Sequence, residues 1–280
     1  MRTHAWGPTG WQVPVLGQGT WYLDQAHREE AIRALRRGLD LGMTHVDTAE
    51  MYGSGAVEEM VGEAISGRRD EVFLVSKVLP SNASFRGTLG ACERSLERLG
   101  TDWLDCYLLH WRGKYPLEET FGAFDRLVDQ GKIRSWGVSN FDVDDLEEAL
   151  GFTGEGRITC NQVLYNLEER TTEYRVLPWC EDHRVSMVAY SPLGHGQFPS
   201  PSSPRGRALV QVARNHGATL RQVALAFVTR RPSLFAIPKA SRVAHVEENA
   251  GAADLRLTRE EISLIDEAFA SEPRPELPML

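Results

Sequence analysis

The chain has 280 residues, of which 42% are hydrophobic and 25% charged, the composition of a folded globular protein. Its formal net charge of −8 argues against a nucleic-acid-binding or anionic-membrane surface. There is no long apolar run for a membrane span, no signal-peptide apolar region and no paired cysteine motif, so we expect a reduced cytoplasmic protein.

Strand and helix patterns alternate after a hairpin-like start around Pro8 to Gly10. The spacing of apolar residues predicts helices over 29–41, 57–65, 84–100, 118–132, 143–152, 172–184, 206–217, 219–231 and 258–269. Gly131 is expected to end the helix over 118–132. Apolar strand patterns occur at 15–19, 43–49, 71–78, 102–111, 133–141, 157–166, 185–194 and 233–241.

Eight strand candidates separated by helices predict an α/β fold, a (β/α)8 TIM barrel with an N-terminal β-hairpin and additional helices. Each βα unit needs about 30 residues, and eight of them make a barrel of about 250 residues. A doubly wound sheet is the competing fold, and it needs fewer strands. No linker or composition break divides the chain, so we expect one domain over 1–280 with a polar, proline-rich tail from 270 to 280.

Polar residues follow the expected strands, at the end where barrel active sites collect. They are Gly19-Thr20-Trp21, Asp47 with Tyr52, Lys77, His110-Trp111, Ser139-Asn140, Gln162, Tyr190-Ser191 and Lys239. Taken singly, Lys77 could be a solvated rim residue, His110 a structural histidine and Asp47 a turn cap. Their joint placement at successive strand ends favours an active site.

The chemistry of four of these residues fits together. A free tyrosine has a pKa of about 10, and a cation such as Lys77 beside Tyr52 would lower it. Asp47 could anchor Lys77, while His110 could orient a carbonyl oxygen toward the Tyr52 hydroxyl. The set contains no nucleophile and no metal cage. It suits protonation of a carbonyl that receives hydride, which requires a cofactor.

At this point the chain resembles the aldo-keto reductases, NAD(P)H-dependent carbonyl reductases on a (β/α)8 barrel, and within them a bacterial-type member with short loops. The resemblance runs from VPVLGQGTW to the LTREEI helix. It is carried by HVDTAEMYG, VSKV and YLLHW for the catalytic strands, and by GKIRSWGVSNF, NQVLYN, AYSPLG, IPKAS and HVEENA for the cofactor segments.

The resemblance implies a catalytic tetrad of Asp47, Tyr52, Lys77 and His110, with Tyr52 as general acid. It implies that Ser139, Asn140 and Gln162 hold the nicotinamide carboxamide and that Tyr190 stacks on the ring. Ser191, Leu193 and Gly194 would lie near the pyrophosphate, Lys239 near the adenosine phosphate, and Glu248 and Asn249 near the adenine. The full implied cofactor set is Gly19, Thr20, Trp21, Asp47, Ser139, Asn140, Gln162, Tyr190, Ser191, Pro192, Leu193, Gly194, Ile237, Lys239, Ala240, Ser241, Arg242, His245, Glu248 and Asn249.

Two departures from the family pattern bear on the choice of cofactor. Ala240 stands where the family usually has Ser after the Lys, and His245 stands where many members carry the Arg that grips the 2′-phosphate. Arg242 could compensate, since a guanidinium suits bidentate phosphate contacts. We expect NADPH/NADP+ to be preferred, with NADH possible.

The run YGSGAV imitates a dinucleotide-binding loop, but that motif requires G-x-G-x-x-G. Glu58 occupies the third position, where it would repel a pyrophosphate. We therefore expect Gly53 and Gly55 to shape a turn that brings Tyr52 inward.

The expected substrate-binding residues are Trp21, Tyr52, His110 and Trp111, with Phe85 as a further aromatic candidate. Short loops over 111–117 and 194–204 and a short tail predict an open pocket for small aldehydes, 2-oxoaldehydes such as methylglyoxal, or keto sugars. The alternatives are an NADPH-binding sensor with negligible turnover and, more remotely, a metal-dependent barrel hydrolase, although no H-x-H motif occurs. We expect a small carbonyl substrate, no metal, no nucleic acid or membrane partner, and a monomer rather than an oligomer.

Overall fold

The computed structural model describes residues 1–274 and 276–280. Eight parallel strands form one sheet, in which each strand pairs with the next strand along the chain. They are β3 (Gln18–Gly19), β4 (His45–Asp47), β5 (Phe73–Val78), β6 (Leu104–Leu109), β7 (Ile133–Ser139), β8 (Ile158–Leu164), β9 (Ser186–Tyr190) and β10 (Leu234–Ala236).

The first and last strands meet, which closes the sheet into a barrel. Leu16 forms a parallel bridge with Ala236, and Gly19 forms one with Lys239. The Gly17 amide donates to the Ala236 carbonyl at 2.8 Å. The predicted (β/α)8 barrel is therefore confirmed, although β3 is only two residues long by itself.

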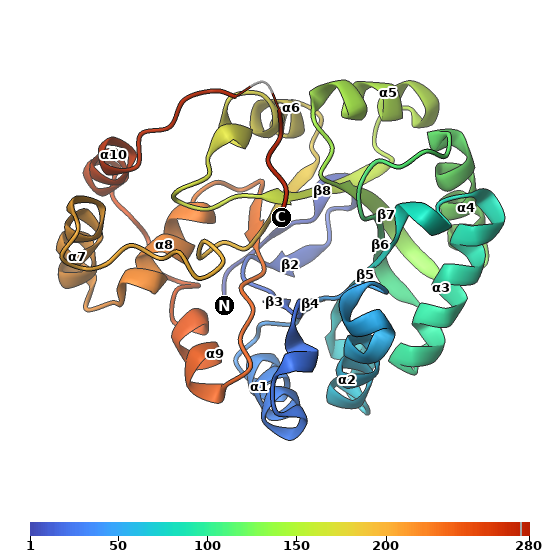
Figure 1. Ribbon diagram of the computed structural model, residues 1–280, viewed down its shortest axis with the longest axis horizontal. Helices are drawn as coiled ribbons and strands as arrows, with labels where there is room; N and C mark the ends of the chain where they lie inside the picture. The colour runs from blue at the N-terminus through green and yellow to red at the C-terminus, as the bar shows by residue number, and fades with distance from the viewer. Residues whose placement is uncertain (275) are drawn as a thin grey trace.

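The helices lie around the outside of the strands (Figure 1). They are α1 (Arg28–Asp40), α2 (Ala56–Ile65), α3 (Phe85–Leu99), α4 (Leu117–Asp129), α5 (Val143–Thr153), α6 (Val176–Asp182), α7 (Pro204–His216), α8 (Leu220–Val228), α9 (Val243–Ala250) and α10 (Arg259–Ala268). Thr219 and Thr258 begin α8 and α10 with complete capping boxes, which satisfy amide groups that the first turn leaves free. No helix in the described residues is both long and apolar enough to cross a bilayer.

The expected N-terminal hairpin is present and covers the amino end of the barrel. Its strands β1 (Thr3–Ala5) and β2 (Gln12–Pro14) pair antiparallel. Trp6, between them, is fully buried and packs edge-on against His45 and Phe235. Its indole N–H donates to the Thr159 hydroxyl at 3.2 Å. The hairpin thus fills the end of the barrel that lies opposite the strand ends rich in polar residues.

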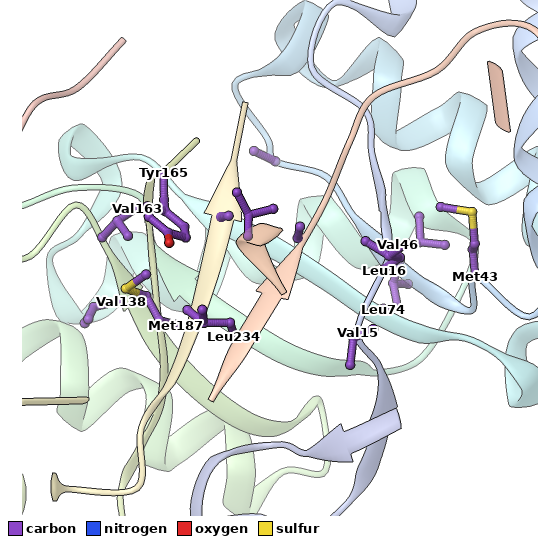
Figure 2. Close-up of a cluster of buried hydrophobic side chains, with 14 of the residues drawn as sticks. Val15, Leu16, Met43, Val46, Leu74, Val138, Val163, Tyr165, Met187 and Leu234 are labelled. Atoms are coloured by element: carbon purple, nitrogen blue, oxygen red, sulfur yellow. The ribbon is translucent and has the colours of Figure 1, made fainter. Parts of the chain in front are cut away.

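Alternating side chains divide the core into two layers, as period-two strands require. The larger layer lies between the strands and helices, and Figure 2 shows part of it, including Val46, Leu74 and Val163. The smaller layer is drawn from the alternate positions and fills the barrel interior: Trp6, Val13, Val75, Cys106, Leu108, Cys160, Val188, Phe235 and Ile237. The interior is therefore packed, and a cavity lies beyond it at the carboxyl end.

The helix expected over 172–184 is shorter than the sequence pattern suggests. A 3-10 turn covers Thr171–Glu173, and α6 begins only at Val176. Pro178 has no amide hydrogen to donate and clashes with the preceding turn, so it fits only near the beginning of a helix. In contrast, Gly131 follows α4 at a φ of 69°, as a residue that ends a helix should.

Candidate active site

The strand period explains how the polar residues reach one end of the barrel. Five of them follow an interior residue by two positions, so their side chains point the same way but one layer further along. In β5, for example, Val75 belongs to the interior layer and Lys77 comes next. The same spacing relates Leu108 to His110, Cys160 to Gln162, Val188 to Tyr190 and Ile237 to Lys239.

Lys77 joins Asp47 to Tyr52 at the bottom of the cavity. Its ammonium group donates to Asp47 Oδ1 at 2.5 Å, to the Thr48 carbonyl at 2.8 Å and to the Tyr52 hydroxyl at 3.4 Å. Lys77 is fully buried, and these three contacts use all three of its donors. Asp47 thus compensates the buried charge of Lys77, and the third donor of the ammonium group is directed at the Tyr52 hydroxyl.

Burial raises the pKa of Tyr52, and Lys77 offsets only part of that rise. The expected lowering is therefore wrong for the net pKa, although the lysine does act in the expected direction. Burial also raises the pKa of Asp47 against the opposing effect of Lys77. For Lys77, burial would lower the pKa, but Asp47 and Tyr52 outweigh it and raise the net value. At neutral pH the phenol is protonated beside an ammonium group.

His110 lies beside Tyr52, with 5.8 Å between the ring centroids and an edge-on orientation. Burial, reinforced by the positive charge of Lys77, lowers the pKa of His110 well below its ordinary value. Nδ1 of His110 is buried without a hydrogen-bond partner among the described residues. The imidazole is therefore neutral at physiological pH, and its one N–H can donate to an oxygen atom without competing as an acid.

The turn Tyr52–Gly55 has positive φ at Gly53, Ser54 and Gly55. A side chain at Gly55 would meet the Arg98 side chain at 2.7 Å. Arg98 in turn pairs with the buried Glu58 at 2.6 Å. The turn is therefore a tight bend held against α3. The glycines serve the bend, and Glu58 serves an ion pair, which argues against a phosphate loop here.

A hydrogen-bonded network lines the wall opposite Tyr52. Tyr190 donates its hydroxyl to Asn140 Oδ1 at 3.0 Å, and Asn140 donates its amide to the His110 carbonyl at 3.1 Å. Ser139 donates to the Gln162 carbonyl at 2.8 Å. Gln162 also donates its side-chain amide to Asp47 Oδ2 at 2.7 Å, a positioning role that the sequence did not suggest. Tyr52 and the amide wall therefore belong to one connected hydrogen-bond network.

These residues surround a cavity of about 550 Å³ at the carboxyl end of the barrel. It brings together the tetrad members Asp47, Tyr52 and His110, with Lys77 beneath them. The other predicted residues that line it are Gly19, Thr20, Trp21, Trp111, Ser139, Asn140, Gln162, Tyr190, Ser191, Pro192, Leu193, Ile237 and Lys239.

The cavity is also lined by residues that were not expected in the site: Tyr22, Met51, His195, Gly196, Pro238, Met279 and Leu280. Trp21 stacks on Tyr22 at 4.5 Å and on His195 at 5.2 Å between centroids. This aromatic cluster and the last two residues of the chain form part of the cavity wall, beside the short loops that the sequence predicts. They come from loops and the tail, where no periodic pattern marks which side chains turn inward.

Seven of the residues implied for the cofactor do not line the cavity: Gly194, Ala240, Ser241, Arg242, His245, Glu248 and Asn249. Ala240, Ser241 and Arg242 lead from β10 into α9, on which the last three lie. Arg242 and His245 are exposed, whereas Asn249 is buried. Phe85 was expected on the aromatic wall, but it is 40% exposed at the beginning of α3 and does not line the cavity, so that prediction is wrong.

The loop after β9 bends sharply beside the cavity. Ser191, Gly194, His195 and Gly196 all have positive φ, between 47° and 87°. Turn backbone can direct amide groups toward phosphate oxygens, but the Gly194 amide is already used within this loop, where it donates to the Ser191 carbonyl at 3.0 Å. Within the described residues, no group of three or more His, Cys, Asp and Glu side chains is arranged to hold a metal ion.

A closed parallel barrel whose cavity holds a protonated phenol, a buried ammonium group and a neutral imidazole is typical of one class of protein, the barrel oxidoreductases. The model of the aldo/keto reductase family matches residues 15–270, so the chain belongs to that family. The resemblance noted from the sequence is thereby confirmed.

Relatives and solved structures agree with this assignment. The chain is 44% identical over 259 residues to a methylglyoxal reductase of Escherichia coli, covering 92% of this chain and 91% of the relative. It is 35% identical over 260 residues to a glyoxal reductase of Bacillus subtilis, covering 92% and 89%. An aldo-keto reductase from Klebsiella pneumoniae, solved in complex with NADPH, superposes with a TM-score of 0.93 at 44% identity and full coverage of both chains. A structure of an aldo/keto reductase from that organism with NADP and acetate gives 0.92, again at 44% identity and full coverage.

Proposed function

We propose that this chain reduces aldehydes and ketones to alcohols, with NADPH as the preferred reductant and Tyr52 as the proton donor. The observation that carries the proposal is the contact between the Tyr52 hydroxyl and the Lys77 ammonium group, 3.4 Å apart at the bottom of the cavity. A protonated phenol held beside a cation is suited to give its proton to an oxygen as negative charge develops there.

The bound cofactor supplies the hydride. The residues of the chain do the rest of the work: Tyr52 protonates the carbonyl oxygen, and the neutral His110 donates a hydrogen bond that holds this oxygen in place. Lys77 stabilises the negative charge that the phenol acquires as it loses its proton. Asp47 fixes Lys77 and is itself fixed by Gln162.

The cavity fits a nicotinamide nucleotide. Ser139, Asn140 and Gln162 present side-chain and backbone hydrogen-bonding groups on one wall, where they suit a carboxamide, and Tyr190 offers an aromatic surface beside them. The positive-φ loop after β9 suits a pyrophosphate. Gly194 belongs to that loop, and Pro192 and Leu193 line the cavity beside it. Gly19, Thr20, Trp21 and Ile237 complete the cofactor-binding wall that we propose.

The adenosine end of the nucleotide would lie outside the cavity, along the beginning of α9. Lys239 at the rim and the exposed Arg242 and His245 offer positive charge or hydrogen bonds to a 2′-phosphate. Ala240, Ser241, Glu248 and Asn249 would complete this end of the site. A preference for NADPH follows, and it is weaker than an arginine at position 245 would give.

The substrate class that we propose is small aldehydes and 2-oxoaldehydes, with methylglyoxal as the leading candidate. Trp21, Tyr52, His110 and Trp111 would contact the substrate, and all four line the cavity. The relatives named methylglyoxal reductase and glyoxal reductase support this choice. Because the stacked rings of Trp21 and His195 form part of the cavity wall, compact substrates are favoured over keto sugars.

We further propose that the protein works as a monomer in the cytoplasm. All of the residues assigned to catalysis come from one chain and lie around one cavity. The four cysteines are buried and unpaired, and burial raises the pKa of Cys92 to about 12, which keeps this thiol unreactive. The net charge of −8 supports the absence of nucleic-acid and membrane partners.

A steady-state assay tests the proposal. Purified protein is mixed with NADPH or NADH and a panel that includes methylglyoxal, 4-nitrobenzaldehyde and a keto sugar, and the loss of absorbance at the nicotinamide band is followed. We expect consumption of NADPH with methylglyoxal and 4-nitrobenzaldehyde, and a higher KM for NADH. Tight NADPH binding without consumption across the panel would show a cofactor sensor instead of an enzyme.

A further inference from the structure

The last two residues of the chain form part of the catalytic cavity. Met279 and Leu280 line it, and the Leu280 amide N–H donates to the Tyr190 hydroxyl at 3.4 Å. Their exposed fractions are 55% and 59%, so part of each residue is covered by the cavity. In Figure 1 the tail, coloured red, leaves α10 and ends over the strands near the centre of the view.

Contacts earlier in the tail direct it toward the cavity. The Tyr174 hydroxyl donates to the Ser271 carbonyl, and Arg274 pairs with Glu169 at 3.1 Å. Leu277 is partly buried against the main core. The tail is therefore attached to the barrel at Ser271 and Arg274 and again at Leu277. These attachments direct Met279 and Leu280 toward the cavity.

The tail and the cofactor need the same residue. Tyr190 is the side chain on which we place the nicotinamide ring, so this inference rests on the proposed function. With the tail in place, the Leu280 amide is hydrogen-bonded to the Tyr190 hydroxyl, and the side chains of Met279 and Leu280 take up part of the cavity. A nicotinamide ring on Tyr190 would have to displace them.

We propose that residues 276–280 are an autoinhibitory plug, which rests on Tyr190 when no cofactor is bound and withdraws before the nicotinamide ring stacks there. The plug is held weakly, because its one hydrogen bond to Tyr190 is long and its apolar side chains are only partly covered. Only the open fraction of molecules binds the nicotinamide. The apparent dissociation constant for NADPH is therefore raised by the reciprocal of the open fraction.

The test compares two ligands on the full-length protein. The double substitution Met279→Ser and Leu280→Ser keeps the chain length and removes the apolar contacts of the plug. Dissociation constants are measured by tryptophan fluorescence for NADPH and for adenosine 2′,5′-bisphosphate, which has no nicotinamide. We expect NADPH to bind about three- to tenfold more tightly to the double variant, as a closed fraction of roughly 70–90% would give. Adenosine 2′,5′-bisphosphate should bind unchanged.

Glu272→Gln, an exposed change earlier in the tail, is the control and should leave both constants unchanged. Unchanged NADPH affinity in the double variant overturns the plug. Weaker NADPH affinity also overturns it, since the tail would then close over bound cofactor. Equal tightening of both ligands overturns the competition at Tyr190. Failure of the wild-type protein to bind NADPH overturns the proposed function as well, whereas normal wild-type binding and turnover confine any failure to the plug.

Discussion

The pKa of Tyr52 depends on the balance between burial and the charge of the neighbouring Lys77. Burial raises the pKa of its phenol, and Lys77, in contact at 3.4 Å, opposes that rise. In the direction of reduction this balance is useful, because the acid must hold its proton until the carbonyl oxygen becomes basic. The lysine then stabilises the phenolate that remains. The pair accordingly matters more for the transition state than for the resting pKa.

Removing the Tyr52 hydroxyl should therefore abolish most of the activity without removing the cofactor site. We expect Tyr52→Phe to lower kcat for 4-nitrobenzaldehyde by about 10²- to 10⁴-fold, the usual size of a general acid's contribution. The dissociation constant for NADPH should change little. Tyr115→Phe makes the same chemical change at a residue outside the cavity and should leave kcat unaltered. A Tyr52→Phe enzyme with normal turnover would remove Tyr52 from the mechanism.

A second prediction concerns the contribution of His245 to NADPH binding. It is exposed at the beginning of α9, where a permanent positive charge could reach a 2′-phosphate. We expect His245→Arg to tighten NADPH binding by about three- to tenfold, because a guanidinium makes bidentate phosphate contacts that imidazole cannot. NADH binding should stay the same. Equal changes in the two dissociation constants, measured by fluorescence titration, would show that position 245 does not meet the phosphate.

Residues that reach the cavity could be predicted from the sequence at the strand ends, and less completely in the loops and the tail. Lys77, His110 and Gln162 each follow an interior residue by two positions, so the strand period fixes their direction. His195 and Leu280 also line the cavity, but they lie in a loop and in the tail. There the direction of a side chain depends on backbone dihedrals and distant contacts, which one sequence does not reveal.

At the scale of elements, the bend between β4 and α2 is held from outside by α3. Gly55 has a φ of 99°, and its missing side chain leaves room for Arg98, which neutralises the buried Glu58. The sequence predicted the bend from its glycines. It could not predict the Arg98 contact, because that contact joins elements 40 residues apart in the chain.

Gly55→Ala should therefore destabilise the protein more than a positive φ alone explains. An alanine there would meet Arg98 at 2.7 Å and disturb its pair with Glu58. Gly67→Ala is the matched control, since Gly67 has a φ of 76° and open space around it. We expect a loss of about 1–2 kcal/mol for Gly67→Ala and about 3–5 kcal/mol for Gly55→Ala, both from urea unfolding. Equal losses would mean that the Arg98 contact is unimportant.

Helix ends show the same division between local and distant causes. Gly131 ends α4 as predicted, because a glycine at positive φ is a local signal. The late beginning of α6 at Val176 was missed, because the apolar spacing over 172–184 outweighed Pro178 in the prediction. A residue that is incompatible with a helix interior, such as Pro178, is therefore a stronger signal for where a helix begins than apolar residues that are compatible with it.

For the whole molecule, closure of the barrel joins parts of the chain that the sequence places more than 200 residues apart. Gly19 approaches the Ile237 carbonyl so closely that a side chain there would lie 2.4 Å from it. The count of eight strand patterns predicted the barrel, but not this contact. Since no linker interrupts the chain, we propose that residues 1–280 form one domain.

The buried end of the barrel makes stability depend on pH. His45 is fully buried without partners for its ring nitrogens among the described residues, and burial lowers its pKa to about 3. Below its unfolded pKa of about 6.5, the unfolded chain binds a proton that the folded chain does not. The free energy of unfolding is therefore highest above pH 6.5 and falls as the pH drops from 6.5 toward 3.

Replacement of His45 by leucine, a residue of similar volume, should remove this dependence. Between pH 7 and pH 5 we expect the wild type to lose about 2 kcal/mol more stability than His45→Leu. Urea unfolding at both pH values measures the difference, and titrating groups elsewhere cancel because they are common to both proteins. Parallel losses in the two proteins would show that His45 titrates normally in the fold.

In the proposed reaction, hydride passes from NADPH to the carbonyl carbon while Tyr52 protonates the carbonyl oxygen. The most direct measurement uses NADPH deuterated at both C4 positions of the nicotinamide, with 4-nitrobenzaldehyde as substrate and mass spectrometry of the alcohol. We expect one deuterium in each product molecule, on the former carbonyl carbon, and almost no product from Tyr52→Phe. Product without deuterium, or no product from the wild-type protein, would contradict it.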